Sequence, residues 1–215
     1  MSLKRSETIL IEGPAGALEV SHHDVSTEHS PPWVAVVCHP HPLYDGTMNN
    51  KVVTILVRTY TALNIPAVRF NFRGVGSSEG EHAEGIGEVD DLVAVASWAR
   101  QRHPGARLLL AGFSFGSGVA GNGVFELADV DHLTLVAPPV GRYGFTSLSS
   151  FPCPWALAMG EQDELVDPAG VFAWAERQSP SPRVLRLPEA GHFFHGHLVQ
   201  LREGLVEILR DQLQL

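Results

Sequence analysis

The stretch Leu108–Ala120 reads LLLAGFSFGSGVA and joins two kinds of secondary structure through one short motif. Its first part, Leu108–Ala111, is continuously apolar and predicts a buried strand, whereas the small residues of Gly116–Ala120 predict the start of a helix. Between them lies a G-x-S-x-G pattern centred on Ser114. Small flanking residues let a strand turn sharply into a helix, and the turn lifts the serine hydroxyl out of the sheet, above the positive helix end.

Strands and helices are predicted to alternate on both sides of this stretch. Apolar, β-branched runs predict strands at Trp33–Cys38, Ala67–Phe72, Leu108–Ala111, Leu133–Ala137, Trp155–Met159 and Arg183–Leu187. Besides the helix that begins at Gly116, further helices are predicted at Asn49–Leu63, Glu84–Arg102, Pro168–Arg177 and Gly196–Gln212. Two more strands, Thr8–Ile11 and Ala17–Ser21, flank the turn-rich Gly13–Gly16. The pattern predicts an α/β fold, with a mostly parallel central sheet, helices on both faces and an amino-terminal antiparallel hairpin.

Composition limits the possible partners. The 215 residues contain no repeat and no clear linker, which indicates a single domain over residues 1–215. Apolar residues make up 44% and charged residues 18%, so the chain can bury a large core. Because 15 Lys and Arg face 24 Asp and Glu, the net charge is −9, which repels phosphate backbones and anionic lipids. We therefore expect no nucleic acid and no membrane as a partner.

The amino terminus and the cysteines indicate the compartment. The first ten residues lack the apolar stretch of a signal peptide, and no apolar run approaches a spanning helix in length, so we expect a cytoplasmic protein. Two cysteines, Cys38 and Cys153, are too few for a disulfide framework and are expected to be reduced packing residues. Nothing in the sequence specifies an oligomeric state.

Three motifs together resemble a known family. GFSFG at 112–116, MGEQDELVDP at 159–168 and AGHFF at 190–194 follow three of the predicted strands. In this order they resemble the small serine hydrolases of the α/β-hydrolase superfamily, from about Trp33 to the end of the chain. The family's chain order of serine, acid and histidine implies a catalytic triad of Ser114, Asp163 and His192.

Three neighbouring histidines are candidates for the general base. A serine hydroxyl is a poor nucleophile until a histidine takes its proton. His192 lies in the loop after the last predicted strand and matches the family motif, whereas His195 and His197 fall at the start of the final helix. The spacing of these three histidines matches neither H-E-x-x-H nor a Cys/His zinc pattern, so no metal is expected here.

Several acidic residues are likewise candidates for the acid of the triad. Asp163 shares its loop with Glu161, Glu164 and Asp167. Asp167 precedes Pro168 and is better explained as a helix N-cap, because proline favours the first helical position. Glu161 and Glu164 are expected to be solvated, which leaves Asp163 to orient the histidine.

Two backbone N–H groups are expected to form an oxyanion hole for the tetrahedral intermediate. Phe115, directly after the nucleophile, is expected to supply one. The second comes, by resemblance, from the loop after the strand Trp33–Cys38, where many relatives carry His-Gly. Here Pro40 replaces the glycine and has no N–H, so His41 is the expected donor, with Leu43 next.

The glycine loop at residues 71–80, NFRGVGSSEG, invites a different interpretation. A dinucleotide-binding G-x-G-x-x-G would need glycine at 79, where Glu79 stands, and the loop does not follow the first βα unit. We therefore interpret it as a tight turn in which Arg73 ties loops together, and no cofactor is expected.

The resemblance implies a serine hydrolase of the carboxylesterase kind, which cleaves a small-molecule ester through an acyl-enzyme intermediate. Thioesterases, peptidases and transacylases use nearly the same triad, and a noncatalytic ligand-binding protein could keep the same fold. All three triad residue types are present, which favours an enzyme.

The connection Pro138–Pro154 is too short for the helical cap that covers a long acyl chain. We therefore expect no cap domain, an open site and a preference for small or short-chain acyl groups. Phe113, Phe145, Phe151 and Phe194 are candidates to line a shallow pocket, although each could equally be an ordinary core residue.

Overall fold

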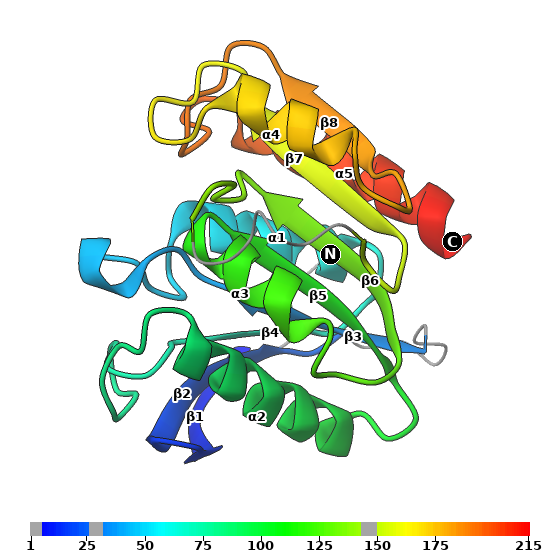
Figure 1. The fold of residues 1–215 in the computed structure, drawn as a ribbon. Helices are drawn as coiled ribbons and strands as arrows, with labels where there is room; N and C mark the ends of the chain where they lie inside the picture. The colour runs from blue at the N-terminus through cyan, green and yellow to red at the C-terminus, as the bar shows by residue number, and fades with distance from the viewer. Residues whose placement is uncertain (1–5, 26–31, 143–149) are drawn as a thin grey trace.

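One eight-stranded sheet organises the molecule, as seen in a computed structural model that describes residues 6–25, 32–142 and 150–215 (Figure 1). The strand order across the sheet is β1-β2-β4-β3-β5-β6-β7-β8. The strands are β1 (Ser6–Gly13), β2 (Gly16–His23), β3 (Trp33–Cys38), β4 (Ala67–Phe70), β5 (Arg107–Phe113), β6 (Val130–Val136), β7 (Trp155–Gly160) and β8 (Arg183–Leu187). The helices are α1 (Lys51–Ala62), α2 (Ile86–Arg102), α3 (Phe115–Gly123), α4 (Pro168–Ala175) and α5 (Leu198–Leu213), with a short 3₁₀ helix η1 at Pro42–Tyr44.

The predicted fold class is confirmed. Strands β1 and β2 form the antiparallel hairpin, and β2 joins the rest of the sheet by pairing antiparallel with β4. All the remaining pairs, from β4 through β3 to β8, are parallel. Helices α2, α3 and α4 lie in front of the sheet in Figure 1, and α1 and α5 lie behind it. No helix among the described residues has the length and apolarity that a bilayer span requires.

The buried centre of the sheet explains why these runs form strands. β3 is buried from Val34 to Cys38, and all of β7 is buried, as expected where helices cover both faces of parallel strands. Cys38 and Cys153 are both buried and free, which agrees with their prediction as packing residues.

Local hydrogen bonds explain where the elements differ from the predicted ranges. Helix α1 begins at Lys51 because the side chain of Asn50 accepts the N–H of Val52 at 2.8 Å, so Asn50 is its N-cap. Strand β4 ends at Phe70, two residues before the predicted end, although Asn71 still donates its N–H to the carbonyl of Glu19 in β2 at 2.9 Å. The following N–H, that of Phe72, donates to a histidine ring instead of to a neighbouring strand, so the chain leaves the sheet there.

Six parallel strands, β3 to β8, end at the same edge of the sheet. The loops that follow β3, β5, β7 and β8 carry every residue that the sequence singled out for catalysis, including Ser114 after β5 and His192 after β8. This edge is where open parallel sheets place their ligands.

Candidate active site

Ser114 lies at the turn between β5 and α3 in a backbone conformation that side chains other than glycine rarely adopt, with φ 54° and ψ −121°. Hydrogen bonds hold this turn from β6 and from the first turn of α3. The N–H of Ser114 donates to the carbonyl of Val136 in β6 at 2.9 Å, and the hydroxyl of Ser117 lies 2.7 Å from the carbonyl of Gly112. The strain is therefore held by the neighbouring strand and the first turn of the helix.

The two glycines of the motif are required by close backbone contacts. A Cβ at Gly112 would lie 2.1 Å from the carbonyl oxygen of Gly116, so the strand could not turn back so tightly. A Cβ at Gly116 would lie 2.5 Å from the carbonyl oxygens of Cys38 and His39. Gly116 thus lets the start of α3 contact the loop after β3, which brings that loop beside Ser114.

The structure brings the three predicted triad residues together. The Nε2 atom of His192 lies 3.0 Å from Oγ of Ser114, and its Nδ1 atom lies 2.7 Å from Oδ2 of Asp163. The side chain of Asp163 is fully buried and that of His192 is 3% exposed. Three residues from three loops, after β5, β7 and β8, therefore form a continuous hydrogen-bonded chain.

Backbone groups fix the orientation of Asp163. Its Oδ1 atom accepts the N–H groups of Leu165 and Val166, both at 2.8 Å, while Oδ2 faces the histidine. The backbone N–H of His192 donates to Oε2 of Glu164 at 3.1 Å. Two successive acidic residues thus hold the histidine, one through its ring and one through its backbone.

Other predicted candidates stay outside this chain of hydrogen bonds. His195 is exposed, and Nδ1 of His197 contacts Gln200 at 2.7 Å in the first turn of α5. Asp167 caps α4 as predicted, because its carboxylate accepts the N–H groups of Ala169 and Gly170. Glu161 is exposed and lies 3.7 Å from Arg186.

The loop after β3 is shaped by His39. This buried ring accepts the N–H of Phe72 through Nε2 at 3.0 Å and contacts the carbonyl of Pro40 through Nδ1 at 2.6 Å. Burial lowers the pKa of His39 to about 4, so the ring is neutral near pH 7 and can serve both bonds. The His39 ring thus fixes the shape of this loop through two hydrogen-bond contacts.

His41 lies on the same side of the cavity as the start of α3. Its ring centroid is 4.8 Å from that of Phe115, and its Nδ1 atom accepts the N–H of Leu43 at 3.2 Å. This hydrogen bond uses the amide of Leu43, the second-choice oxyanion donor. The rings of Phe115 and His41 thus pack together at the cavity that Ser114 also lines.

A cavity of about 440 Å³ opens above Ser114. Its lining includes Ser114, His192, both predicted oxyanion donors, and a set of side chains that the sequence did not single out for the pocket: Tyr44, Asn50, Arg142, Leu165 and Phe193. Glu164, which was expected to be merely solvated, also lines the cavity.

Of the two alternatives left open for the phenylalanines, the structure supports the core for three of them. Phe113, Phe151 and Phe194 belong to the buried core and do not border the cavity, although Phe113 packs against the ring of His192 with centroids 5.1 Å apart. The fourth candidate, Phe145, lies outside the described residues. Aromatic composition alone does not distinguish a side chain that faces the core from one that faces a cavity.

The glycine loop is a structural turn, as predicted. Arg73 makes a forked contact with the buried carboxylate of Asp91 in α2, with its closest nitrogen at 2.7 Å, and its backbone N–H also donates to that carboxylate. The loop is thereby fixed to the helix that follows it.

Known proteins share both this fold and much of the sequence. The chain is 42% identical to an α/β serine hydrolase homologue from Coxiella burnetii, with a TM-score of 0.90 over 96% of this chain and 99% of that one. It is 40% identical to an α/β serine hydrolase without a lid from Xanthomonas campestris, with a TM-score of 0.89 over 98% and 96% of the two chains. An uncharacterized protein of Rickettsia prowazekii is 34% identical over 195 residues, which are 86% of this chain and 81% of the relative.

No family model matches the sequence. The identity to the two solved homologues nevertheless extends over nearly the whole chain, from β1 to α5. The homologue from Xanthomonas campestris has no lid. The chain therefore belongs to the α/β serine hydrolases, in their lidless form.

Proposed function

We propose that this protein is a carboxylesterase that cleaves esters of small or short-chain acids through an acyl-enzyme on Ser114. The observation that carries the proposal is the hydrogen-bonded chain Ser114–His192–Asp163, with contacts of 3.0 and 2.7 Å, whose serine and histidine line an open cavity. Serine, histidine and acid in this arrangement perform acyl transfer on several unrelated folds.

In the first half-reaction, Nε2 of His192 takes the hydroxyl proton of Ser114 while Oγ attacks the ester carbonyl carbon. Asp163 holds the Nδ1 proton and stabilises the imidazolium that forms. When the tetrahedral intermediate collapses, the bond to the alkoxy oxygen breaks and His192 gives its proton to the departing alcohol. Water then repeats the sequence on the acyl-enzyme, which releases the acid and restores Ser114.

The developing oxyanion needs donors that are already in place. The backbone N–H of Phe115, at the first position of α3, and that of His41 are the proposed pair, and both residues line the cavity beside Ser114. The close contact at Gly116 supports this pairing, because it holds the two loops together.

The size and lining of the cavity support small substrates. A volume of about 440 Å³ lies at the lower end of small-molecule sites, and Leu165 and Phe193, which border it, are themselves half-exposed to solvent. A long acyl chain would find little further apolar surface there.

A fluorophosphonate probe tests whether Ser114 is an activated nucleophile. We expect the wild-type chain to be labelled and the Ser114→Ala variant not to be labelled. The Ser97→Ala variant removes an exposed serine of α2 that borders neither the triad nor the cavity, and it serves as the matched control, which should retain labelling. Parallel assays with an ester, a thioester and an anilide of the same acyl group distinguish esterase from thioesterase and peptidase activity; faster turnover of the thioester or anilide would contradict the proposal.

A further inference from the structure

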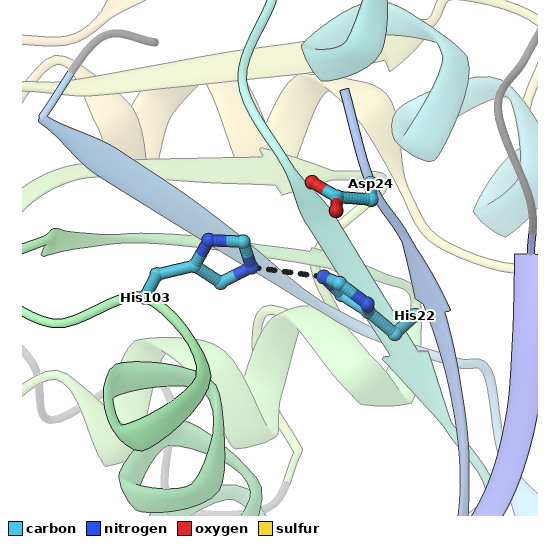
Figure 2. Close-up of side chains that lie close together, drawn as sticks. All are labelled: His22, Asp24 and His103. Atoms are coloured by element: carbon cyan, nitrogen blue, oxygen red, sulfur yellow. Dashed lines mark hydrogen bonds between the residues drawn. The ribbon is translucent and has the colours of Figure 1, made fainter. Parts of the chain in front are cut away.

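A second group of polar side chains lies far from the catalytic residues. Nε2 of His22 lies 2.8 Å from Nε2 of His103, and the carboxylate of Asp24 completes a group whose three ligand atoms all lie within 4.8 Å of one another. Figure 2 shows the two rings pointing toward each other, with the Asp24 carboxylate near the gap between them. Among residues 6–25, 32–142 and 150–215, this is the one such group of three His, Cys, Asp or Glu side chains.

The three residues come from separate parts of the fold. His22 is in β2, Asp24 follows the end of that strand, and His103 is the C-cap of α2. His22 pairs with Val68, near the start of β4, and His103 lies shortly before the start of β5. Since Ser114 follows the carboxyl end of β5, the group lies at the opposite edge of the sheet from the catalytic cavity.

We propose that His22, Asp24 and His103 form a binding site for a divalent transition-metal ion of the zinc type. Two imidazole nitrogens and one carboxylate oxygen are ligands that Zn²⁺ accepts, and a water molecule can take the fourth tetrahedral position on the side where Asp24 is exposed. Two neutral imidazoles and one carboxylate give the site a net charge of −1, which suits a divalent cation.

Small movements would complete the coordination. Two nitrogens bound to one tetrahedral zinc ion at about 2.0–2.1 Å lie about 3.3 Å apart, so the two rings need to separate by about 0.5 Å. His22 is 4% exposed and is fixed in the sheet. The side chains that would move are therefore those of His103, at the helix end, and of the exposed Asp24. Both lie in segments without strand pairing, where such a shift costs little.

The surroundings also favour a cation. The carboxyl end of α2 carries the partial negative charge of the helix dipole, and His103 lies at that end. Arg102 is the nearby positive charge, and Glu7 lies 3.4 Å from it and partly neutralises it. The neighbouring His23 is not a fourth ligand, because its Nε2 atom already accepts from Arg69 at 3.2 Å.

A bound ion would join the amino-terminal hairpin to α2. Among the described residues, the links across this edge include the histidine pair, the exposed pair of Arg102 and Glu7, and a ring contact between His22 and Trp98 of α2 with centroids 5.8 Å apart. A ligand that binds the folded chain alone stabilises it by mass action, so the ion is expected to act on stability and not on the chemistry at Ser114.

Calorimetric titration of the chelator-treated full chain with Zn²⁺ tests the proposal. We expect one Zn²⁺ per chain, and a Tm that rises by about 5 °C or more at 100-fold excess over Kd. Asp24→Asn and His103→Gln are expected to weaken binding at least about tenfold and to abolish most of the Tm rise. The matched control is His197→Gln, another partly exposed histidine beside a helix end, which should bind like the wild type.

The outcomes are separable from those for the esterase. Ester hydrolysis should be the same in the zinc-loaded and zinc-free chain, so failure of the metal site leaves the esterase proposal intact. If the wild type binds no stoichiometric Zn²⁺, or if Asp24→Asn and His103→Gln bind as tightly as His197→Gln does, the site does not exist. Titration with Co²⁺ gives a second readout, because a tetrahedral site intensifies its visible absorption, and a spectrum unchanged from that of the hydrated ion would equally overturn the proposal.

Discussion

The carboxylate of Glu164 accepts the backbone N–H of His192 at 3.1 Å, next to Asp163, which contacts the ring of the same histidine at 2.7 Å. Glu164 also borders the cavity, so its contact fixes the histidine loop where substrate binds. The geometry makes Glu164 a positioning residue, because its carboxylate acts on the backbone of the base and not on its ring.

Glu164→Ala should therefore reduce kcat by about tenfold without unfolding the chain. A hydrogen bond to a charged group contributes about 1.5–3 kcal/mol, and its exposed position keeps the effect at the lower end. Asp167→Ala, an acidic residue in the same loop, is the matched control: it removes a helix cap, so it should lower the free energy of unfolding by about 1 kcal/mol and leave kcat unchanged. Equal loss of kcat in both variants would argue against a positioning role.

Ser114→Ala and His192→Ala should each lower kcat by about 10⁶-fold, because the triad acts as a unit. Asp163→Asn should lower it by about 10⁴-fold, since the ring then loses the acceptor that selects its tautomer. Circular dichroism should show that each variant is folded. His195→Ala is the control, because that exposed ring is three residues from His192 and outside the hydrogen-bonded chain. A severe loss in His195→Ala combined with a mild one in His192→Ala would assign the base differently.

Gly116→Ala should both destabilise the chain and abolish turnover. The added Cβ would lie 2.5 Å from the backbone carbonyl oxygens of Cys38, at the end of β3, and of His39, which follows it, and backbone cannot move aside cheaply. We expect a loss of about 2 kcal/mol in the free energy of unfolding and a fall in kcat of at least about 100-fold, as the two oxyanion loops separate.

Gly118→Ala provides the matched control in the same helix. Its nearest neighbour would be Cγ of Pro139 at 3.4 Å, an ordinary contact, and alanine favours a helix over glycine by about 1 kcal/mol. This variant should be at least as stable as the wild type and fully active. Urea unfolding and initial rates on one preparation measure both effects, and an active Gly116→Ala would show that the close approach is dispensable.

The order of elements could be predicted because it depends on local signals, whereas the triad residues were implied by the resemblance of three motifs to the α/β-hydrolase superfamily. The apolar run Leu108–Ala111 and the small residues after it specify a strand and a helix wherever they occur. Ser114, Asp163 and His192 each follow a strand, and the topology of a parallel sheet then brings strand ends together.

Contacts between distant segments could not be predicted in the same way. His22 and His103 are 81 residues apart, and neither carries a recognisable ligand spacing, so their pairing follows from how α2 packs on the hairpin. The prediction that Glu164 is merely solvated was wrong for a related reason. An acidic residue in a loop is usually solvated, and its contact with the amide of His192 depends on the relative position of two loops 28 residues apart.

Acidification should destabilise the fold through buried histidines. Burial lowers the pKa of His39 and of His132 to about 4, below the ordinary value of 6.5. Between these values the unfolded chain binds more protons than the folded one, so this contribution to stability is complete above pH 6.5 and is lost as the pH falls toward 4. Each histidine should reduce the free energy of unfolding by up to about 1.4 kcal/mol per pH unit in that window.

Urea unfolding at pH 7, 6 and 5 measures this slope. His132→Gln removes one titrating ring at a site remote from Ser114, so the slope should flatten by up to about 1.4 kcal/mol per pH unit even where the variant is less stable at pH 7. A His132→Gln variant with an unchanged slope would show that this ring does not titrate as its burial implies.

The open cavity should limit the chain length of the acyl group that the enzyme uses well. Each methylene that is buried in the transition state contributes up to about 0.8 kcal/mol, or close to fourfold in kcat/KM. A cavity of about 440 Å³ bordered by the partly exposed Leu165 and Phe193 can bury only a few carbons of the acyl chain, so kcat/KM for p-nitrophenyl esters should rise from acetate and then level off well before palmitate.

Phe193→Ala should shift the optimum to shorter chains, whereas Val199→Ala, which changes an exposed apolar residue in α5 outside the cavity lining, should not. Because the fold has no lid to open, rates should also cross the critical micelle concentration without a jump. An optimum at long chains, or a sharp increase when the substrate forms an interface, would contradict an open site for small esters.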